Sequence, residues 1–184
     1  MTKRTGYFFE LIRLSPEQAV FIDETGTRLN MTPLYGRSPK GERAYDTRSA
    51  AKGIRISMIG ALSFKGPLDR VCFGGTLDGT VFTYYIEHFL SGLLRPGKAV
   101  IMDNASPHKN EEALNMIEDK GAEILFLPPY CPELNPIEYC RSKIKNFLGK
   151  LKPRTMNELY DGCSMSLNLI DADTARSCFR HCGL

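Results

Sequence analysis

The stretch KAVIMDNASPHKNEEALNMIEDKGAEILFLPP (residues 98–129) contains two short apolar runs separated by a segment with a different period. Residues 98–105 hold four consecutive apolar side chains, which is typical of a strand covered on both faces. Residues 110–121 form an amphipathic helix that ends at a glycine, and the second buried strand at 122–129 ends at two prolines. A helix between two buried strands predicts an α/β sheet.

Upstream of this stretch, the sequence predicts three more strands and one longer helix. The strands are short apolar runs that end at turn residues, and they lie at 19–27, 54–63 and 70–77. The linker at 64–69 fits a hairpin loop between the last two strands. Residues 79–94 repeat apolar side chains at a helical period, with Thr80 as the expected N-cap.

Downstream, three helices are expected to complete the domain. Four prolines within 126–136 stiffen the approach to the first helix, which Asn135 caps and Pro136 opens. Two shorter helices, at 155–170 and 171–183, close the chain. The order of elements predicts an α/β fold with a mixed five-stranded sheet flanked by helices, and this order resembles that of the ribonuclease-H-like fold.

The same pattern predicts the domain organisation. We expect a short N-terminal lead-in at 1–18 and one domain at 19–184, without internal repeats. Residues 28–53 are a long, weakly periodic, basic loop inserted after the first strand, and loops of this length are usually functional or disordered.

The composition excludes two classes of protein. With 184 residues, of which 42% are hydrophobic and 24% charged, the chain is typical of a globular domain. No apolar run reaches the roughly 18 to 20 residues of a membrane span, and the N-terminus lacks the apolar core of a signal peptide. The six cysteines show no zinc-like spacing with the three histidines, so we expect reduced, mostly buried thiols. A cytoplasmic protein without membrane contact is expected.

The net charge is only +3, but the positive charges are concentrated in two segments. Residues 28–55 contain seven lysines and arginines against two acids, and residues 139–157 contain six against none. Two such segments on a nearly neutral background favour contact with a polyanion. A solvated charged face is the alternative meaning of either segment alone.

Three carboxylates lie at the ends of predicted elements. Asp23 ends the first strand, Asp103 ends the most buried one, and Glu138 lies one turn into the helix that Asn135 caps. Ligands of open α/β sheets bind at the carboxyl ends of strands, so the three side chains can converge if the first and fourth strands are neighbours. Such a set suits Mg²⁺ or Mn²⁺, and two ions roughly 3.5–4 Å apart can act on a phosphodiester.

Each carboxylate also has a local explanation. Asp23 and Asp103 can each begin an Asx-turn. Glu138 follows Asn135 at the spacing of a capping box, in which its side chain would reach back to the backbone of the cap. The grouping of the three carboxylates with two basic segments favours a metal site over these separate roles.

Six longer motifs add to this reading: FIDETG (21–26), YGRSPKGER (35–43), ISMIGAL (56–62), VIMDNASPHK (100–109), LFLPPYCPELNPIEYCRSKIK (125–145) and RSCFRHCG (176–183). In combination they resemble the catalytic domain of mariner-like transposases, especially the bacterial insertion-sequence branch. The resemblance extends over nearly the whole chain. By itself, either the Asp-Asn-Ala motif or the Asn-Pro-Ile-Glu motif would be weak.

The resemblance implies a metal-dependent activity on DNA. In that family an Asp-Asp-Glu triad binds two Mg²⁺ or Mn²⁺ ions, and the matching motifs place it at Asp23, Asp103 and Glu138, with 34 residues between the last two. The implied reaction is hydrolysis at transposon ends followed by attack of the freed 3′-hydroxyl on target DNA. The resemblance implies a homodimer on paired DNA ends. It also implies a cytoplasmic protein that is associated with the nucleoid.

The residues expected to contact nucleic acid are Arg37, Lys40, Arg43, His108, Arg141, Lys143 and Lys145. The first three lie where relatives carry a loop that clasps the partner subunit, so they would contact phosphate or partner. The histidine matches one found near the metal site of the family, and a turn-stabilising role is its alternative. For the two lysines the alternative is solvation.

Two features depart from the family pattern. Relatives carry a helix-turn-helix region ahead of the catalytic domain; for this chain the expected alternatives are that a separately encoded module supplies it or that it has been lost. Relatives also commonly have tryptophan three positions after the catalytic glutamate, where this chain has Arg141. Because positions i and i+3 share a helix face, Arg141 can pair with Glu138 or swing outward to a DNA phosphate.

Three functions are compatible with these residues. The favoured one is the catalytic subunit of a DNA transposase. The others are a truncated, catalytically impaired copy that regulates by dimerising and binding DNA, and a related ribonuclease-H-like nuclease. The triad is common to all three, so metal binding and DNA cleavage must separate them.

Overall fold

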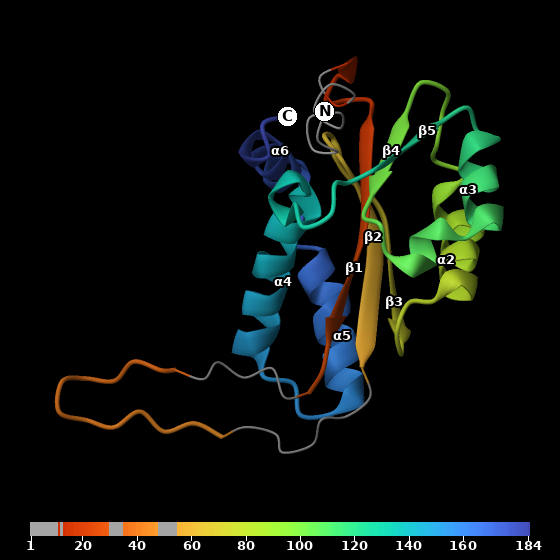
Figure 1. Cartoon of the computed structure of the whole chain (residues 1–184). Helices are drawn as coiled ribbons and strands as arrows, with labels where there is room; N and C mark the ends of the chain where they lie inside the picture. The colour runs from red at the N-terminus through yellow and green to blue at the C-terminus, as the bar shows by residue number, and fades with distance from the viewer. Residues whose placement is uncertain (1–10, 12, 30–34, 48–54) are drawn as a thin grey trace.

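The computed structural model describes residues 11, 13–29, 35–47 and 55–184, in which a five-stranded sheet lies between two layers of helices (Figure 1). The strands are β1 (Ala19–Thr27), β2 (Ile56–Ser63), β3 (Gly66–Gly74), β4 (Ala99–Met102) and β5 (Glu123–Phe126). Their order in the sheet is β3-β2-β1-β4-β5. β1, β2 and β3 pair antiparallel, whereas β4 is parallel to β1 and to β5, so the sheet is mixed as predicted.

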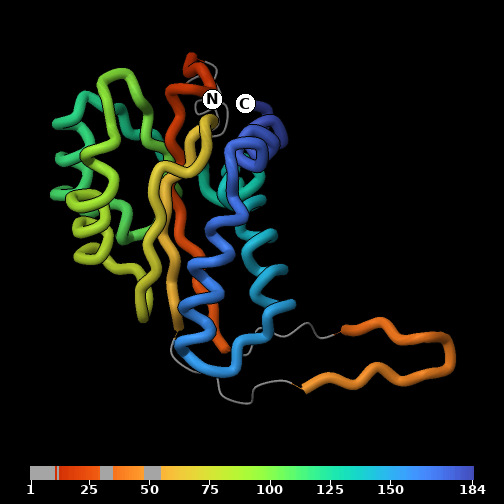
Figure 2. Tube along the Cα trace, turned by 180° about the vertical axis from the view of Figure 1, so that it is seen from behind, coloured from red at the N-terminus to blue at the C-terminus, as the bar shows by residue number. Residues whose placement is uncertain are grey.

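Helices cover both faces of this sheet (Figures 1 and 2). One face carries α2 (Gly79–Tyr85), its π-helical continuation η1 (Ile86–Leu90) and α3 (Glu111–Glu118). The other carries α4 (Pro136–Leu151), α5 (Met156–Leu167) and α6 (Ala172–His181). Two 3-10 helices, η2 (Ser106–Lys109) and η3 (Pro132–Leu134), lie in connecting loops. No helix in the described ranges has both the length and the apolar character needed to cross a bilayer.

The alternation of side chains along β1 and β4 sets the face on which later residues lie. In β4, Val100 and Met102 pack into the core beneath α2 and α3, whereas Ile101 packs into the core beneath α4 and α6. All are fully buried, as the apolar run predicts. Phe21 of β1 shares the second core and pairs with Ile101. Positions two residues beyond this pair therefore lie on the α4 side of the sheet.

The hairpin between β2 and β3 is tighter than the sequence predicts. Strand pairing resumes at Gly66 rather than at residue 70, so the predicted loop at 64–69 is wrong. A register shift between Ala61 and Leu62 places Pro67 opposite Leu62, and a proline is tolerated there because β3 is an edge strand. The strand ends at Gly74, since Gly75 has a φ of 103° that breaks the extended backbone.

Two further expectations are corrected by the structure. The N-cap of α2 is Asp78 rather than Thr80, because the Asp78 side chain accepts a hydrogen bond from the backbone N–H of Val81 at 2.9 Å. The second apolar run is only partly buried, because Glu123 is exposed and the three residues after it in β5 are half-buried. The prolines that follow end the strand at Phe126.

The described part of the inserted loop, residues 35–47, extends away from the body of the molecule (Figure 1). At the end of this segment, Asp46 contacts Lys152 and Thr47 contacts Arg154, both in the turn after α4. Residues 30–34 and 48–53 of the predicted insertion, including Arg48 and Lys52, lie outside the described residues, as does most of the predicted lead-in. All six cysteines are free and five are buried, as expected.

Candidate active site

Three carboxylates from three separate elements line one cavity of about 380 Å³. Asp23 belongs to β1, Asp103 directly follows β4, and Glu138 lies in the first turn of α4. The alternation described above places Asp23 and Asp103 on the face that α4 covers. The loop at 127–135, which joins β5 to α4, supplies most of the remaining wall.

Asp23 is the most buried of the three carboxylates, with 8% of its surface exposed. Its Oδ1 accepts a hydrogen bond from the backbone N–H of Glu24 at 2.7 Å, and its Oδ2 accepts one from Asn135 Nδ2 at 2.7 Å. Burial raises the pKa of Asp23 to about 6, while the guanidinium of Arg141, 3.8 Å from Oδ2, opposes this rise. The two hydrogen bonds therefore fix the side chain of Asp23, and burial makes its ionised form less favourable than that of a carboxyl group in water.

Asp103 is half-exposed and is held by a buried histidine. Its Oδ1 accepts a hydrogen bond from His108 Nδ1 at 2.6 Å and another from the backbone N–H of Ala105 at 3.0 Å. The second bond closes the Asx-turn that the sequence offers as an alternative. The hydrogen bond from His108 lowers the pKa of Asp103 below its ordinary value. Asp103 is thus held in its ionised form.

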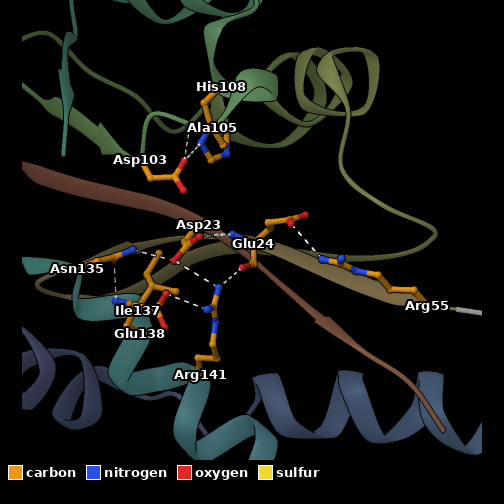
Figure 3. A network of polar contacts seen from close by, with 10 residues as sticks. All are labelled: Asp23, Glu24, Arg55, Asp103, Ala105, His108, Asn135, Ile137, Glu138 and Arg141. Atoms are coloured by element: carbon orange, nitrogen blue, oxygen red, sulfur yellow. Dashed lines mark hydrogen bonds and ion pairs between the residues drawn. The ribbon is translucent and has the colours of Figure 1, made fainter. Parts of the chain in front are cut away.

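His108 supports Asp103 rather than facing solvent. It lies in η2, is 1% exposed, and its ring packs 4.8 Å from the ring of Phe82. Since a carboxylate only accepts hydrogen bonds, the proton of this pair is on Nδ1. A histidine buried to this extent offers almost no surface to a DNA phosphate, and it lies behind Asp103 (Figure 3). This position favours the supporting role, and the expected contact with nucleic acid stays a prediction.

Glu138 pairs with Arg141 one turn later on α4, as the i, i+3 spacing allows. The distance from Glu138 Oε1 to Arg141 Nη1 is 2.8 Å. Arg141 Nη2 also donates to the backbone oxygen of Glu24 at 2.5 Å, so the guanidinium lies between α4 and β1 (Figure 3). The capping-box alternative is wrong, because the N–H of Asn135 donates to the Pro132 oxygen at 3.0 Å instead. In this position Arg141 meets carboxylates and does not face outward to DNA.

Asn135 has a second role that the sequence does not reveal. Its Oδ1 accepts from the backbone N–H of Ile137 at 3.0 Å, which is the predicted cap of α4. Its Nδ2 donates to Asp23, so one buried amide joins the helix that carries Glu138 to the strand that carries Asp23. The cap was predictable from the Asn-Pro pair, but the contact with a residue more than a hundred positions away was not.

The donor set suits a hard divalent cation, but its members are engaged with other groups. As the side chains stand, no three histidine, cysteine or acidic residues in the described part of the chain are close enough together to hold an ion. Arg141 binds Glu138 and approaches Asp23, which keeps these two carboxylates neutralised. Asp103 keeps its Oδ2 free of any hydrogen bond within the described chain. Carboxylate oxygens around one cavity therefore fit Mg²⁺ or Mn²⁺ once the guanidinium moves aside.

Asp23 gives the protein an expected pH dependence. An acid with a folded pKa raised from 3.8 to about 6 binds more protons folded than unfolded between these values. Stability from this group is present below pH 4 and is lost as the pH rises through 6, by up to about 3 kcal/mol. We expect urea denaturation to show this loss in the wild type relative to Asp23→Asn. Parallel stability profiles of the two proteins between pH 4 and 7 would contradict the raised pKa.

The remaining basic residues fall into two groups. Arg37, Lys40 and Arg43 are exposed on the extended loop at 35–47. Lys143 donates to Thr174 Oγ1 of α6 at 3.0 Å and therefore holds two helices together. Lys143 is itself exposed, so its expected contact with phosphate stays a prediction.

Lys145 lies at a second polar cavity beside the carboxylates, with a volume of about 400 Å³. Arg28 and Arg55 line the same cavity, and Arg55 forms an ion pair with Glu24 at 3.1 Å. Arg28 and Lys145 are exposed and have no ion-pair partner among the described residues. The cavity thus has an excess of positive charge next to the candidate active site.

Comparisons with known proteins bear on the fold and the family. A family model described as DDE superfamily endonuclease matches residues 18–159. A comparison with curated protein sequences finds no match.

Solved structures of the Mos1 transposase are similar in fold. Its paired-end complex with the left transposon end has a TM-score of 0.78 at 12% identity, over 97% of this chain and 57% of that chain. The catalytic domain of Mos1 mariner transposase has a TM-score of 0.67 at 12% identity, over 97% and 85%. The mariner Mos1 paired-end complex with Mg has a TM-score of 0.73 at 14% identity. This likeness confirms the ribonuclease-H-like fold, and the chain spans just over half of the length of the first complex.

Proposed function

Because the chain belongs to the DDE superfamily endonucleases, we propose that it is the catalytic part of a mariner-like DNA transposase of the bacterial insertion-sequence type. It would hydrolyse phosphodiesters at transposon ends and join the freed 3′-hydroxyl to target DNA. The observation that carries the proposal is the single cavity lined by Asp23, Asp103 and Glu138. We propose that residues 1–18 are a lead-in and residues 19–184 the catalytic domain. We also propose that the protein is cytoplasmic and associated with the nucleoid.

The proposed site uses each carboxylate as a ligand of divalent metal. When bound there, Mg²⁺ or Mn²⁺, as two ions, would activate the attacking oxygen and stabilise the charge on the leaving oxygen. Asn135 holds Asp23 in place, and His108 holds Asp103 with its charge available. Rigid support of this kind is what a catalytic carboxylate needs.

DNA and a second subunit are the proposed partners. The structural relatives include a paired-end complex of Mos1 transposase with the left transposon end and the Mos1 strand transfer complex. In this chain the exposed cations of the 35–47 loop, Arg37, Lys40 and Arg43, would reach DNA phosphate or a second copy in a homodimer.

Removing the charge of Lys145 is expected to weaken DNA binding in a salt-dependent way. Each cation that neutralises a phosphate contributes about one unit to the slope of log affinity against log salt. We therefore expect Lys145→Ala to bind duplex DNA less tightly, with a slope shallower by about 1, in fluorescence anisotropy titrations. Lys120→Ala, which removes an exposed lysine after α3, is the matched control. Equal slopes for Lys145→Ala and wild type would show that Lys145 does not contact a DNA phosphate.

One observation favours a second candidate function. The ion pair between Arg141 and Glu138 occupies a ligand of the proposed metal site. A copy in which this pair persists would bind DNA and dimerise without cleaving, and would regulate an active partner. A related ribonuclease-H-like nuclease is the other alternative.

The proposal is tested by nicking of supercoiled plasmid. With Mg²⁺ or Mn²⁺ present we expect open circles to form, and with EDTA we expect none. DNA binding without nicking under any metal would favour the regulatory copy instead. Cleavage that proceeds unchanged in EDTA would overturn the metal-dependent proposal.

A further inference from the structure

Tyr130 is an unusual residue in the wall of the carboxylate cavity. Its surface is 100% exposed, the highest value among the exposed large hydrophobic residues of the described chain. It lines the same cavity as Asp23, Asp103 and Glu138. What distinguishes it from other exposed tyrosines, such as Tyr35 and Tyr45, is its place beside the three carboxylates. Its ring is available there to a ligand that enters the cavity.

The backbone at Tyr130 is held in a conformation that L-residues avoid. Its φ is 59°, and Tyr130 is one of two non-glycine residues with positive φ in the described chain. Such conformations persist where the surrounding structure imposes them, and they are concentrated at functional sites.

The surrounding loop imposes this conformation from both sides. On the N-terminal side, Leu127 N–H donates to the Met102 oxygen at 2.8 Å, and Asn104 Nδ2 donates to the Leu127 oxygen at 2.7 Å. On the C-terminal side, Cys131 is buried and η3 begins with Pro132. The ring of Tyr130 is thus presented by a rigid loop anchored to β4, the strand that precedes Asp103.

The cavity itself limits how DNA can approach the carboxylates. Its volume of about 380 Å³ is that of a pocket for one small ligand, and Asp23 in its wall is 8% exposed. A whole duplex is too large to enter such a space, so a phosphodiester brought as deep as Asp23 would come on a strand separated from its complement. A separated strand exposes the faces of its bases beside the phosphate, and exposed aromatic rings bind such faces by stacking.

We infer that Tyr130 is a stacking platform for an unpaired nucleobase next to the phosphodiester that the carboxylates engage. This inference rests on the proposed function, because it requires a DNA strand in the carboxylate cavity. It adds to that function a stacking contact that binds a separated strand through its base and does not depend on the charge of its phosphates. Since every base offers a π-face, Tyr130 would select for separated strands over duplex rather than for a sequence.

The absence of tryptophan from the chain allows a direct test. Tyr130→Trp creates a protein with one indole, whose emission a stacked base quenches. The probe is a short single-stranded oligonucleotide without divalent metal, compared with an abasic oligonucleotide of equal length. We expect quenching by the first and not by the second. Tyr84→Trp, which places an indole at an exposed position on α2, should be quenched by neither.

Affinity gives a second readout. By fluorescence anisotropy, Tyr130→Ala should bind the single strand roughly 5- to 150-fold less tightly than wild type, and the two proteins should bind the abasic strand equally. Tyr130→Phe should bind as wild type does. Tyr130→Asn tests the backbone separately, because asparagine tolerates positive φ but cannot stack. It should lose affinity without losing thermal stability.

The outcomes separate this inference from the proposed function. Binding of the single strand without quenching at position 130, or with unchanged affinity in Tyr130→Ala, overturns the stacking role and leaves the nuclease proposal intact. Quenching by the abasic strand overturns it as well. Failure of the wild type to bind any DNA, together with no nicking of plasmid, overturns both.

Discussion

Replacing Arg141 with an uncharged side chain will raise the affinity of the carboxylate cavity for divalent metal by at least tenfold. Arg141 contacts Glu138 at 2.8 Å and lies 3.8 Å from Asp23, so its charge falls within the proposed metal site. A guanidinium roughly 6 Å from a divalent ion opposes its binding by about 5 to 6 kcal/mol at an effective dielectric of 20, before screening. Salt and movement of the side chain reduce this figure, and tenfold is the lower bound of the expected gain.

The measurement is binding of Mn²⁺ followed by electron paramagnetic resonance, with plasmid nicking as a second readout. Arg141→Gln removes the charge, and Arg141→Trp does so with an aromatic side chain. An apolar cavity lined by Leu62, Ile137 and Ile144 lies beside Arg141 and offers space for the larger ring. Arg141→Lys keeps the charge and should bind Mn²⁺ as the wild type does. Unchanged affinity in Arg141→Gln, or an equal gain in Arg141→Lys, would contradict this role of Arg141.

The layers of the fold were predictable because burial leaves a strong pattern in the sequence. The four apolar residues of β4 are covered on both faces, and the polar residues after them mark the edge of the sheet. Edge strands leave a weaker pattern. The pairing of β3 from Gly66 includes a register shift beside Pro67, and β5 is an edge strand whose residues are only partly buried. Neither feature is contained in local periodicity.

The candidate site was predictable as a set of residues but not as a set of contacts. The carboxylates were found because each lies beside an apolar run or a helix cap that the sequence shows, and the spacing of Arg141 and Glu138 on one helix indicated their pairing. The bond from Asn135 to Asp23 and the backbone of Tyr130 depend on how distant segments meet. The burial of His108 follows from the packing of η2 against Phe82, which no local pattern predicts.

Asp103→Ala is expected to reduce nicking by roughly a thousandfold or more. The proposed metal site supplies several kcal/mol of transition-state stabilisation, and each 1.36 kcal/mol corresponds to a factor of ten in rate. Loss of Asp103 removes a proposed ligand whose ionised form is favoured, since the hydrogen bond from His108 lowers its pKa. Asp103→Asn is the conservative companion, because it keeps an acceptor for His108 while removing the charge. Asp119→Ala, on an exposed residue after α3, is the matched control.

The catalytic role of the carboxylate cavity is tested most directly by plasmid nicking with the wild type and with Asp103→Ala at equal concentration. Circular dichroism must show that both proteins are folded. We expect open circles from the wild type only when Mg²⁺ or Mn²⁺ is present, and almost none from Asp103→Ala. Nicking at the same rate by both proteins would contradict a catalytic role for the carboxylate cavity. No nicking by the folded wild type with either metal would contradict the proposed nuclease and leave the regulatory copy.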